Sequence, residues 1–169
     1  MQNLLITKDI RLDVSEMPDC DIRENYPTDS KEIKDDKELK PFVLRNKCFV
    51  DGVYYPQSSS IYSNPFQFHF EITGNGKPYN WDGATIPRIL WPLIGGKGSP
   101  EFLIASLFHD YMCEHKAILN GNRYLSSLIL REVLIACGTP KWKAGIMFVS
   151  VDLFQRTQGW DKYIKVNKQ

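Results

Sequence analysis

The sequence predicts an α+β fold: a small antiparallel β-sheet in the N-terminal half, packed with a bundle of about three helices in the C-terminal half. Three observations predict it. Short β-prone runs separated by turn residues fill residues 42–78, whereas helical apolar patterns with recognisable ends fill residues 99–157. The length of 169 residues fits one domain and is enough to bury a substantial core.

The N-terminal region is the least regular part of the sequence. Residues 1–41 carry eleven acidic and seven basic side chains, and the stretch 15–41 holds three prolines and a dense run of mixed charge. We expect residues 1–41 to form an acidic arm with one short helix over 29–39, while the apolar run 4–6 docks as an edge strand. We therefore divide the single domain, 1–169, into this arm, a core over 42–157 and a tail over 158–169.

The predicted sheet begins with a strand over 42–44. Residues 48–50 and 53–55 then form a hairpin, because Asp51-Gly52 between two β-prone runs favours a tight turn. In the stretch 66–72, apolar and polar residues alternate, so that three phenylalanines and Ile72 share one face of a strand. A turn over 73–78 ends this region.

Three helices are predicted in the second half. The first begins at Ser99-Pro100-Glu101, a capping serine followed by proline and an acid, and runs to about Glu114. The second begins near Asn122 and stops at Gly138, with a proline shortly beyond. The third covers 141–157 and ends before a glycine.

Composition and charge argue against several classes of protein. The net charge is +1 and the basic residues are scattered, so we expect no nucleic-acid binding. No apolar stretch reaches the length of a membrane span, and the N-terminus lacks the pattern of an export signal. The four cysteines are far apart, which favours a reduced setting over disulfides or a structural zinc site.

The candidate site joins two segments of the chain. His109 is one of three histidines, and it stands beside Asp110 inside an apolar helical pattern. Burying such a pair is costly unless other groups satisfy it. The turn from Asp82 to Thr85 offers a carboxylate and a hydroxyl, so we expect it to fold against the middle of the first long helix. Adjacent helical residues diverge by about 100°, which predicts that His109 and Asp110 point in different directions.

These segments resemble a known family. The resemblance is carried by the stretch Trp81-Asp-Gly-Ala-Thr-Ile-Pro-Arg88, the Leu90-Trp91-Pro92 after it, the stretch 105–112 around His109-Asp110-Tyr111, and a helix closing on Gly138. Together they are similar to the DUF1353 family over roughly residues 42–157. The resemblance implies a phage or prophage origin, and it supplies no reaction.

Two positions depart from the family pattern. The resemblance implies an acid in the helix that precedes Gly138, and Ser126-Ser127 stands at that place. Thr85 stands where serine is commoner, a change that keeps the hydroxyl. If the acid at the position of Ser127 serves as a metal ligand or a base, its absence makes this chain a weakened or inactive relative.

The polar cluster allows two interpretations from sequence. In the structural one, Asp82 caps its own turn, Asp110 bonds that turn, and His109 donates to a backbone carbonyl. In the catalytic one, an acid orients the imidazole of His109, which acts as a general base on water or on Thr85.

The two interpretations lead to different functions. The catalytic one predicts a small phage-encoded hydrolase, with Arg88 and Tyr111 binding substrate and with Asp82, His109 and Asp110 as candidate ligands of a divalent metal. The alternative is a non-enzymatic phage protein, either a virion or assembly component or a binder of a host protein through the N-terminal arm. Either protein would act in the host cytoplasm or on the virion, in an oligomeric state that the sequence does not give.

Overall fold

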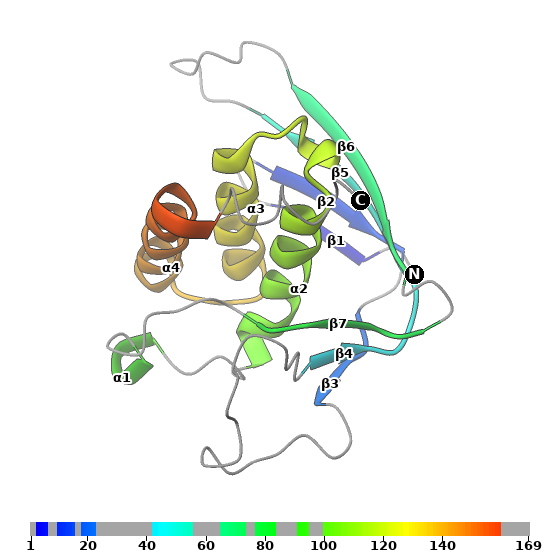
Figure 1. The fold of residues 1–169 in the computed structure, drawn as a ribbon, viewed down its shortest axis with the longest axis horizontal. Coiled ribbons are helices and arrows are strands. Elements are labelled where there is room, and N and C mark those ends of the chain that lie inside the picture. The colour runs from blue at the N-terminus through cyan, green and yellow to red at the C-terminus, as the bar shows by residue number, and fades with distance from the viewer. Residues whose placement is uncertain are drawn as a thin grey trace.

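The computed structural model describes residues 3–6, 10–15, 18–22, 42–55, 65–73, 77–83, 91–94 and 100–159 (Figure 1). Within these ranges the chain has an α+β fold, and its helices lie in the C-terminal half as predicted. The strands form two small antiparallel sheets where the sequence predicted one.

The larger sheet has the strand order β1-β2-β5-β6. Its strands are β1 (Asn3–Ile6), β2 (Ile10–Val14), β5 (Cys48–Tyr54) and β6 (Phe66–Ile72). The predicted edge strand is confirmed, because β1 lies at one edge and pairs with β2 alone. The predicted alternation in β6 is also confirmed: Phe68, Phe70 and Ile72 are buried, whereas Gln67 and His69 are exposed. One face of this sheet therefore belongs to the core.

The smaller sheet has the order β3-β4-β7, built from β3 (Cys20–Ile22), β4 (Phe42–Leu44) and β7 (Tyr79–Trp81). Strands β1, β2 and β3 all come from the stretch predicted as an arm, so the first part of this stretch contributes to both sheets. The predicted helix over 29–39 lies outside the described residues.

The predicted hairpin around Asp51-Gly52 is wrong. These two residues lie inside the continuous strand β5, where Asp51 is opposite Asp13 of β2 and His69 of β6. The glycine serves a packing role instead: a Cβ at Gly52 would lie 2.1 Å from Cζ of Phe68. The aromatic ring of the neighbouring strand occupies the space above the glycine, and the strand runs straight through.

The three predicted helices begin and end close to the predicted residues, and the structure adds two short ones, α1 and η2. They are α1 (Trp91–Ile94), α2 (Pro100–Glu114), α3 (Arg123–Ala136) and α4 (Lys141–Phe154), with a short 3₁₀ helix η2 (Lys116–Leu119) before α3. The side chain of Asn122 caps α3 by accepting from the backbone of Leu125, and Gly138 follows the helix at a φ of +94°. Helix α4 continues into a π-helical turn, η3 (Gln155–Gly159).

The core lies between the larger sheet and α2, with α3 beside α2 and α4 on the outer side of α3 (Figure 1). Aromatic rings join the layers: Phe70 of β6 contacts Phe108 at 5.9 Å and Tyr111 at 5.7 Å between ring centroids. Helix α2 is therefore buried from both sides, and its polar residues must find partners inside the protein. Among the described residues, no helix has the length and apolar character needed to cross a membrane.

Candidate functional site

Strand β7, which precedes the predicted turn, contacts α2. The indole Nε1 of Trp81 donates to Oγ of Ser106 at 3.0 Å, and both side chains are fully buried. The hydroxyl of Tyr79 donates to Oε2 of Glu114, also at 3.0 Å. The strand that leads into Asp82 thus lies along α2. Asp82 itself is half-buried, whereas Thr85 and Arg88 lie outside the described residues.

The pKa of Tyr79 is affected by the negative charge around this contact. Burial raises the pKa of its phenol far above the ordinary value, and the nearby carboxylates of Glu114, Asp110 and Asp82 raise the pKa further. Both predicted site acids therefore lie close enough to Tyr79 to act on the same hydroxyl. In the folded protein this tyrosine stays protonated and acts as a hydrogen-bond donor.

His109 and Asp110 interact directly, which corrects the expectation that their side chains point in different directions. Nδ1 of His109 lies 3.4 Å from Oδ1 of Asp110, a long hydrogen bond. The two residues are only 8% and 7% exposed. Torsion about the side-chain bonds lets neighbours on a helix converge although their Cα–Cβ bonds diverge.

The opposite ring nitrogen of His109 meets a residue that sequence analysis did not single out. Nε2 of Gln155 lies 3.0 Å from Nε2 of His109, and Oγ of Ser127 donates to Oε1 of Gln155 at 2.9 Å. An amide nitrogen can only donate, so Nε2 of His109 accepts and the ring proton sits on Nδ1, facing Asp110. A directed chain of hydrogen bonds thus runs from Ser127 through Gln155 and His109 to Asp110. We call these four residues the His109 network.

Cys113 lies against the same network, one helical turn after His109. Its sulfur accepts from Nε2 of Gln155 at 2.9 Å and lies 3.6 Å from Nε2 of His109. The residue is buried, and its thiol is free. At 2% exposure the sulfur is closed to any substrate of appreciable size.

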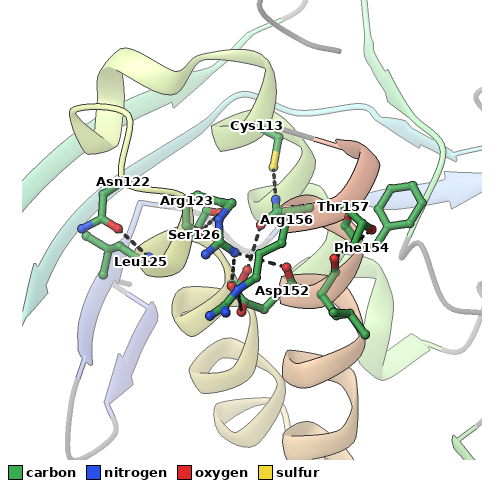
Figure 2. Close-up of polar contacts among 12 residues, drawn as sticks. Cys113, Asn122, Arg123, Leu125, Ser126, Asp152, Phe154, Arg156 and Thr157 are labelled. Atoms are coloured by element: carbon green, nitrogen blue, oxygen red, sulfur yellow. Dashed lines mark hydrogen bonds and ion pairs between the residues drawn. The ribbon is translucent and has the colours of Figure 1, made fainter. Parts of the chain in front are cut away.

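An ionic cluster lies at the end of α4, directly before Gln155 in the chain (Figure 2). Asp152 pairs with Arg123 of α3 and with Nε of Arg156, the latter at 2.8 Å. Arg123 also donates to the backbone carbonyl of Asp152. These contacts tie the last turn of α4 to the first turn of α3, and the following π-helical turn begins at Gln155. The amide is therefore aimed at His109 by groups on two helices.

Two further expectations concern Tyr111 and a metal. Tyr111, expected to bind substrate, donates its hydroxyl to the carbonyl of Glu71 at 2.5 Å and stacks on His115 at 4.2 Å between centroids. Its hydroxyl joins α2 to β6. Within the part of the chain that the structure describes, no three His, Cys, Asp or Glu side chains gather closely enough to hold a metal ion.

Gln155 and Ser127 show what sequence reasoning missed. Residues 144, 147 and 151 form the buried apolar stripe of α4, and Gln155 follows on the same stripe. A lone polar residue at a core position was the available signal, since a buried amide needs partners. In the sequence, Ser127 stands out only because the family resemblance implies an acid at its position. In the structure, one side chain, that of Gln155, separates this position from the imidazole of His109.

The fold and the site define a small α+β protein with a buried His–Asp pair that is bridged by a glutamine to a serine. A family model described as protein of unknown function (DUF1353) matches residues 61–151. The match covers more than half of the chain, which belongs to this family.

One relative is similar to the chain over a shorter stretch. The uncharacterized protein y4jT of Sinorhizobium fredii (strain NBRC 101917 / NGR234) is 37% identical over 70 residues, which are 41% of this chain and 20% of the relative. The chain therefore aligns with about a fifth of that protein's length. No solved structure matches the chain.

Proposed function

We propose that the chain is a phage-encoded, non-catalytic member of its family, which acts by binding a virion or host protein. In this proposal a protein side chain blocks the base nitrogen of the hydrolase-like His109–Asp110 pair, and the pair serves to stabilise the packing of the helices. The observation that carries the proposal is the donation from the Gln155 amide to Nε2 of His109. A general base needs its lone pair directed at the substrate, and here a protein group takes that lone pair.

Ser127 supports the same proposal. Its hydroxyl fixes the orientation of the Gln155 amide, so that oxygen faces the serine and nitrogen faces the imidazole. The resemblance to the family implies an acid at this place. A carboxylate there would be a charged neighbour of the imidazole, whereas serine and glutamine supply a neutral, fully buried bridge.

The second candidate is an active hydrolase, possible only if Gln155 moves aside. One observation favours it: with the ring proton on Nδ1 and directed at Asp110, the nitrogen left as the base is the one that a catalytic His–acid pair uses. In this candidate, Asp82, Thr85 and Arg88 would complete the site, with or without a divalent metal.

Activity measurements separate the two candidates. We expect the purified chain to hydrolyse model phosphomonoesters and phosphodiesters no faster than a folded His109→Gln variant, whether Mg²⁺, Mn²⁺ or Zn²⁺ is added. A turnover of the unchanged chain that is lost in the variant would contradict the proposal and establish the hydrolase.

A pair of serine variants tests the structural role of the network. Ser127→Ala leaves the buried oxygen of Gln155 without its donor and should lower the free energy of unfolding by about 1–3 kcal/mol. Ser126→Ala is the matched control, because within the described residues the hydroxyl of Ser126 bonds a carbonyl of its own helix, that of Arg123. Urea unfolding measures both losses. Equal losses would mean that Ser127 does not hold the amide.

The binding role is tested in particles of the phage or prophage that encodes the chain. A variant in which an Asn-Gly turn replaces residues 23–41 removes the rest of the predicted arm and leaves β3 a loop through which to pair with β4, since Ile22 and Phe42 are opposite each other in these strands. We expect its incorporation into particles, or its recovery with a host protein, to fall relative to the full chain. Equal recovery of the two would exclude a role for this segment in binding.

A further inference from the structure

The outer face of α4 carries an apolar stripe that the described part of the chain does not cover. Trp142, Val149 and Leu153 are 57%, 60% and 59% exposed, and the half-buried Ile146 lies between them. Side chains of this size are rarely exposed together unless they bind something. In Figure 1, α4 lies at the margin of the molecule, with α3 on its inner side.

The spacing of these four residues defines a second apolar face. They follow one another by four, three and four residues, which confines them to an arc of about 60° around the helix. This is the spacing of a coiled-coil seam. On the opposite side of α4, Ala144, Met147 and Val151 are buried against the rest of the protein. Helix α4 thus has one apolar face packed against the protein and a second one that the described residues leave exposed.

We propose that this outer stripe binds the same stripe of a second copy of the chain, with the two α4 helices antiparallel. The positions of the four apolar residues along the helix are symmetric about a midpoint between residues 147 and 148. A two-fold axis at that point places Trp142 against Leu153 of the second copy, and Ile146 against Val149. A surface that complements itself under a two-fold rotation is what a symmetric dimer requires.

Small residues allow the two helices to approach. The same axis places Gly145 opposite Ser150 of the second copy, beside the stripe. A Cβ built on Gly145 meets no atom within 4 Å, so the space above it is open. Helices with small residues at their contact pack at the short end of the usual interaxial distances.

Charge favours the antiparallel arrangement over the parallel one. In the antiparallel pair, Lys141 and Lys143 of one copy lie at the opposite end of the contact from the same two residues of the other copy. A parallel pair would instead place Lys141 and Lys143 beside the same residues of the second copy, and like charges repel. This dimer does not depend on the His109 network and goes beyond the proposed binding role.

Sedimentation of the full chain tests the proposal. We expect a concentration-dependent dimer, which Val149→Lys weakens at least tenfold by placing two like charges near the axis. Because Val149 is exposed, the variant should fold normally, as circular dichroism can verify. Phe49→Lys is the matched control: Phe49 is an exposed aromatic residue of β5 at 39% exposure, and its variant should dimerise like the unchanged chain. A monomeric unchanged chain, or equal dimerisation of the Val149 variant, would overturn the proposal.

Disulfide trapping tests the orientation. Under mild oxidation, a mixture of Ile146→Cys and Val149→Cys chains should give mixed cross-linked dimers, in excess of those from either variant alone. The unchanged chain, whose four cysteines are free thiols that are buried or half-buried, measures the background. Efficient cross-linking of Ile146→Cys with itself would indicate a parallel pair and overturn the antiparallel arrangement.

Discussion

Gly52 shows that the same residue type can favour two different local structures. Its place after Asp51 is typical of a tight turn, yet in the fold the ring of Phe68 lies directly over it. A glycine in a strand interior commonly marks such a close approach. The aromatic ring of β6 gains a buried position on the core face because β5 has no side chain at this point.

Replacing this glycine should therefore destabilise the larger sheet. The Cβ of Gly52→Ala would overlap the ring of Phe68, and we expect a loss of about 1–3 kcal/mol in the free energy of unfolding, as for overpacked cores. Asp51→Ala, one residue earlier with its side chain 69% exposed, should cost less than 1 kcal/mol, roughly the value of an exposed ion pair. Urea unfolding compares them, and a Gly52 variant as stable as the Asp51 variant would show that the ring can move aside at little cost.

Ser127 and Gln155 illustrate a different point at the same scale. Either residue alone is an ordinary polar side chain, and its role comes from a partner on another helix, 28 residues away in sequence. Each satisfies the other in a buried setting where water is excluded. Removing one partner is expected to cost more than removing both, because an unpaired buried group is left behind.

At the scale of elements, helix ends are set by local signals. Helix α3 begins where the side chain of Asn122 accepts from the backbone amide of Leu125 at 3.0 Å. It ends before Gly138, which adopts a φ of +94° that other residues rarely tolerate. Both signals act within a few residues and need no tertiary contact.

The cap of α3 makes a quantitative prediction. Asn122→Ala removes the acceptor for the Leu125 amide and should lower the free energy of unfolding by about 0.5–2 kcal/mol. Asn122→Asp keeps an acceptor at the same place and should recover most of this loss. Thermal unfolding of the three proteins measures the difference. Equal losses in both variants would mean that the amide group of Asn122 has a role besides capping.

Helix α4 has two roles as an element. Its inner face joins α3 and delivers Gln155 to His109, and the ion pairs of Asp152 fix the last turn (Figure 2). Its outer face offers the stripe proposed to bind a second copy. Because the two faces use different residues, a change on one should leave the other intact.

For the molecule as a whole, the buried tyrosine couples stability to pH. Tyr79 has a pKa raised by burial and by the carboxylate of Glu114. Below a pH of about 10, the ordinary value, the phenol is protonated in both the folded and the unfolded chain and has no effect on the pH dependence. Above it, the unfolded chain releases the proton while the folded protein keeps it, so stability falls as the pH rises.

A phenylalanine variant isolates this effect. At pH 7, Tyr79→Phe should be less stable than the unchanged chain, because it loses the hydrogen bond to Glu114. Above a pH of about 10 the unchanged chain should lose up to about 1.4 kcal/mol per pH unit through this group, and the gap should close. Tyr124→Phe, at an exposed position, is the control and should parallel the unchanged chain. A constant gap between the Tyr79 variant and the unchanged chain from pH 7 to 11 would contradict the assignment.

Much of the fold follows from patterns that are short in sequence. The alternation in residues 66–72 and the start and stop signals around Pro100, Asn122 and Gly138 each predict an element that the structure contains. The predicted hairpin failed because the same dipeptide suits a turn or a close contact, and only the neighbouring strand decides between them. The division into two sheets also depends on which strands pair, and residues far apart in sequence set that pairing.

The candidate site, too, is predicted by the sequence only in part. His109 and Asp110 are adjacent, so sequence alone identified the pair as unusual in an apolar helix, and the stretch 81–112 carried the resemblance to the family. Whether Nε2 of His109 is available to a substrate depends on Gln155, which is 46 residues away in sequence, and on Ser127, whose hydroxyl bonds the Gln155 amide. Local propensity and periodicity act along the chain and can be read from it, whereas a hydrogen bond between two helices exists only once packing has brought them together.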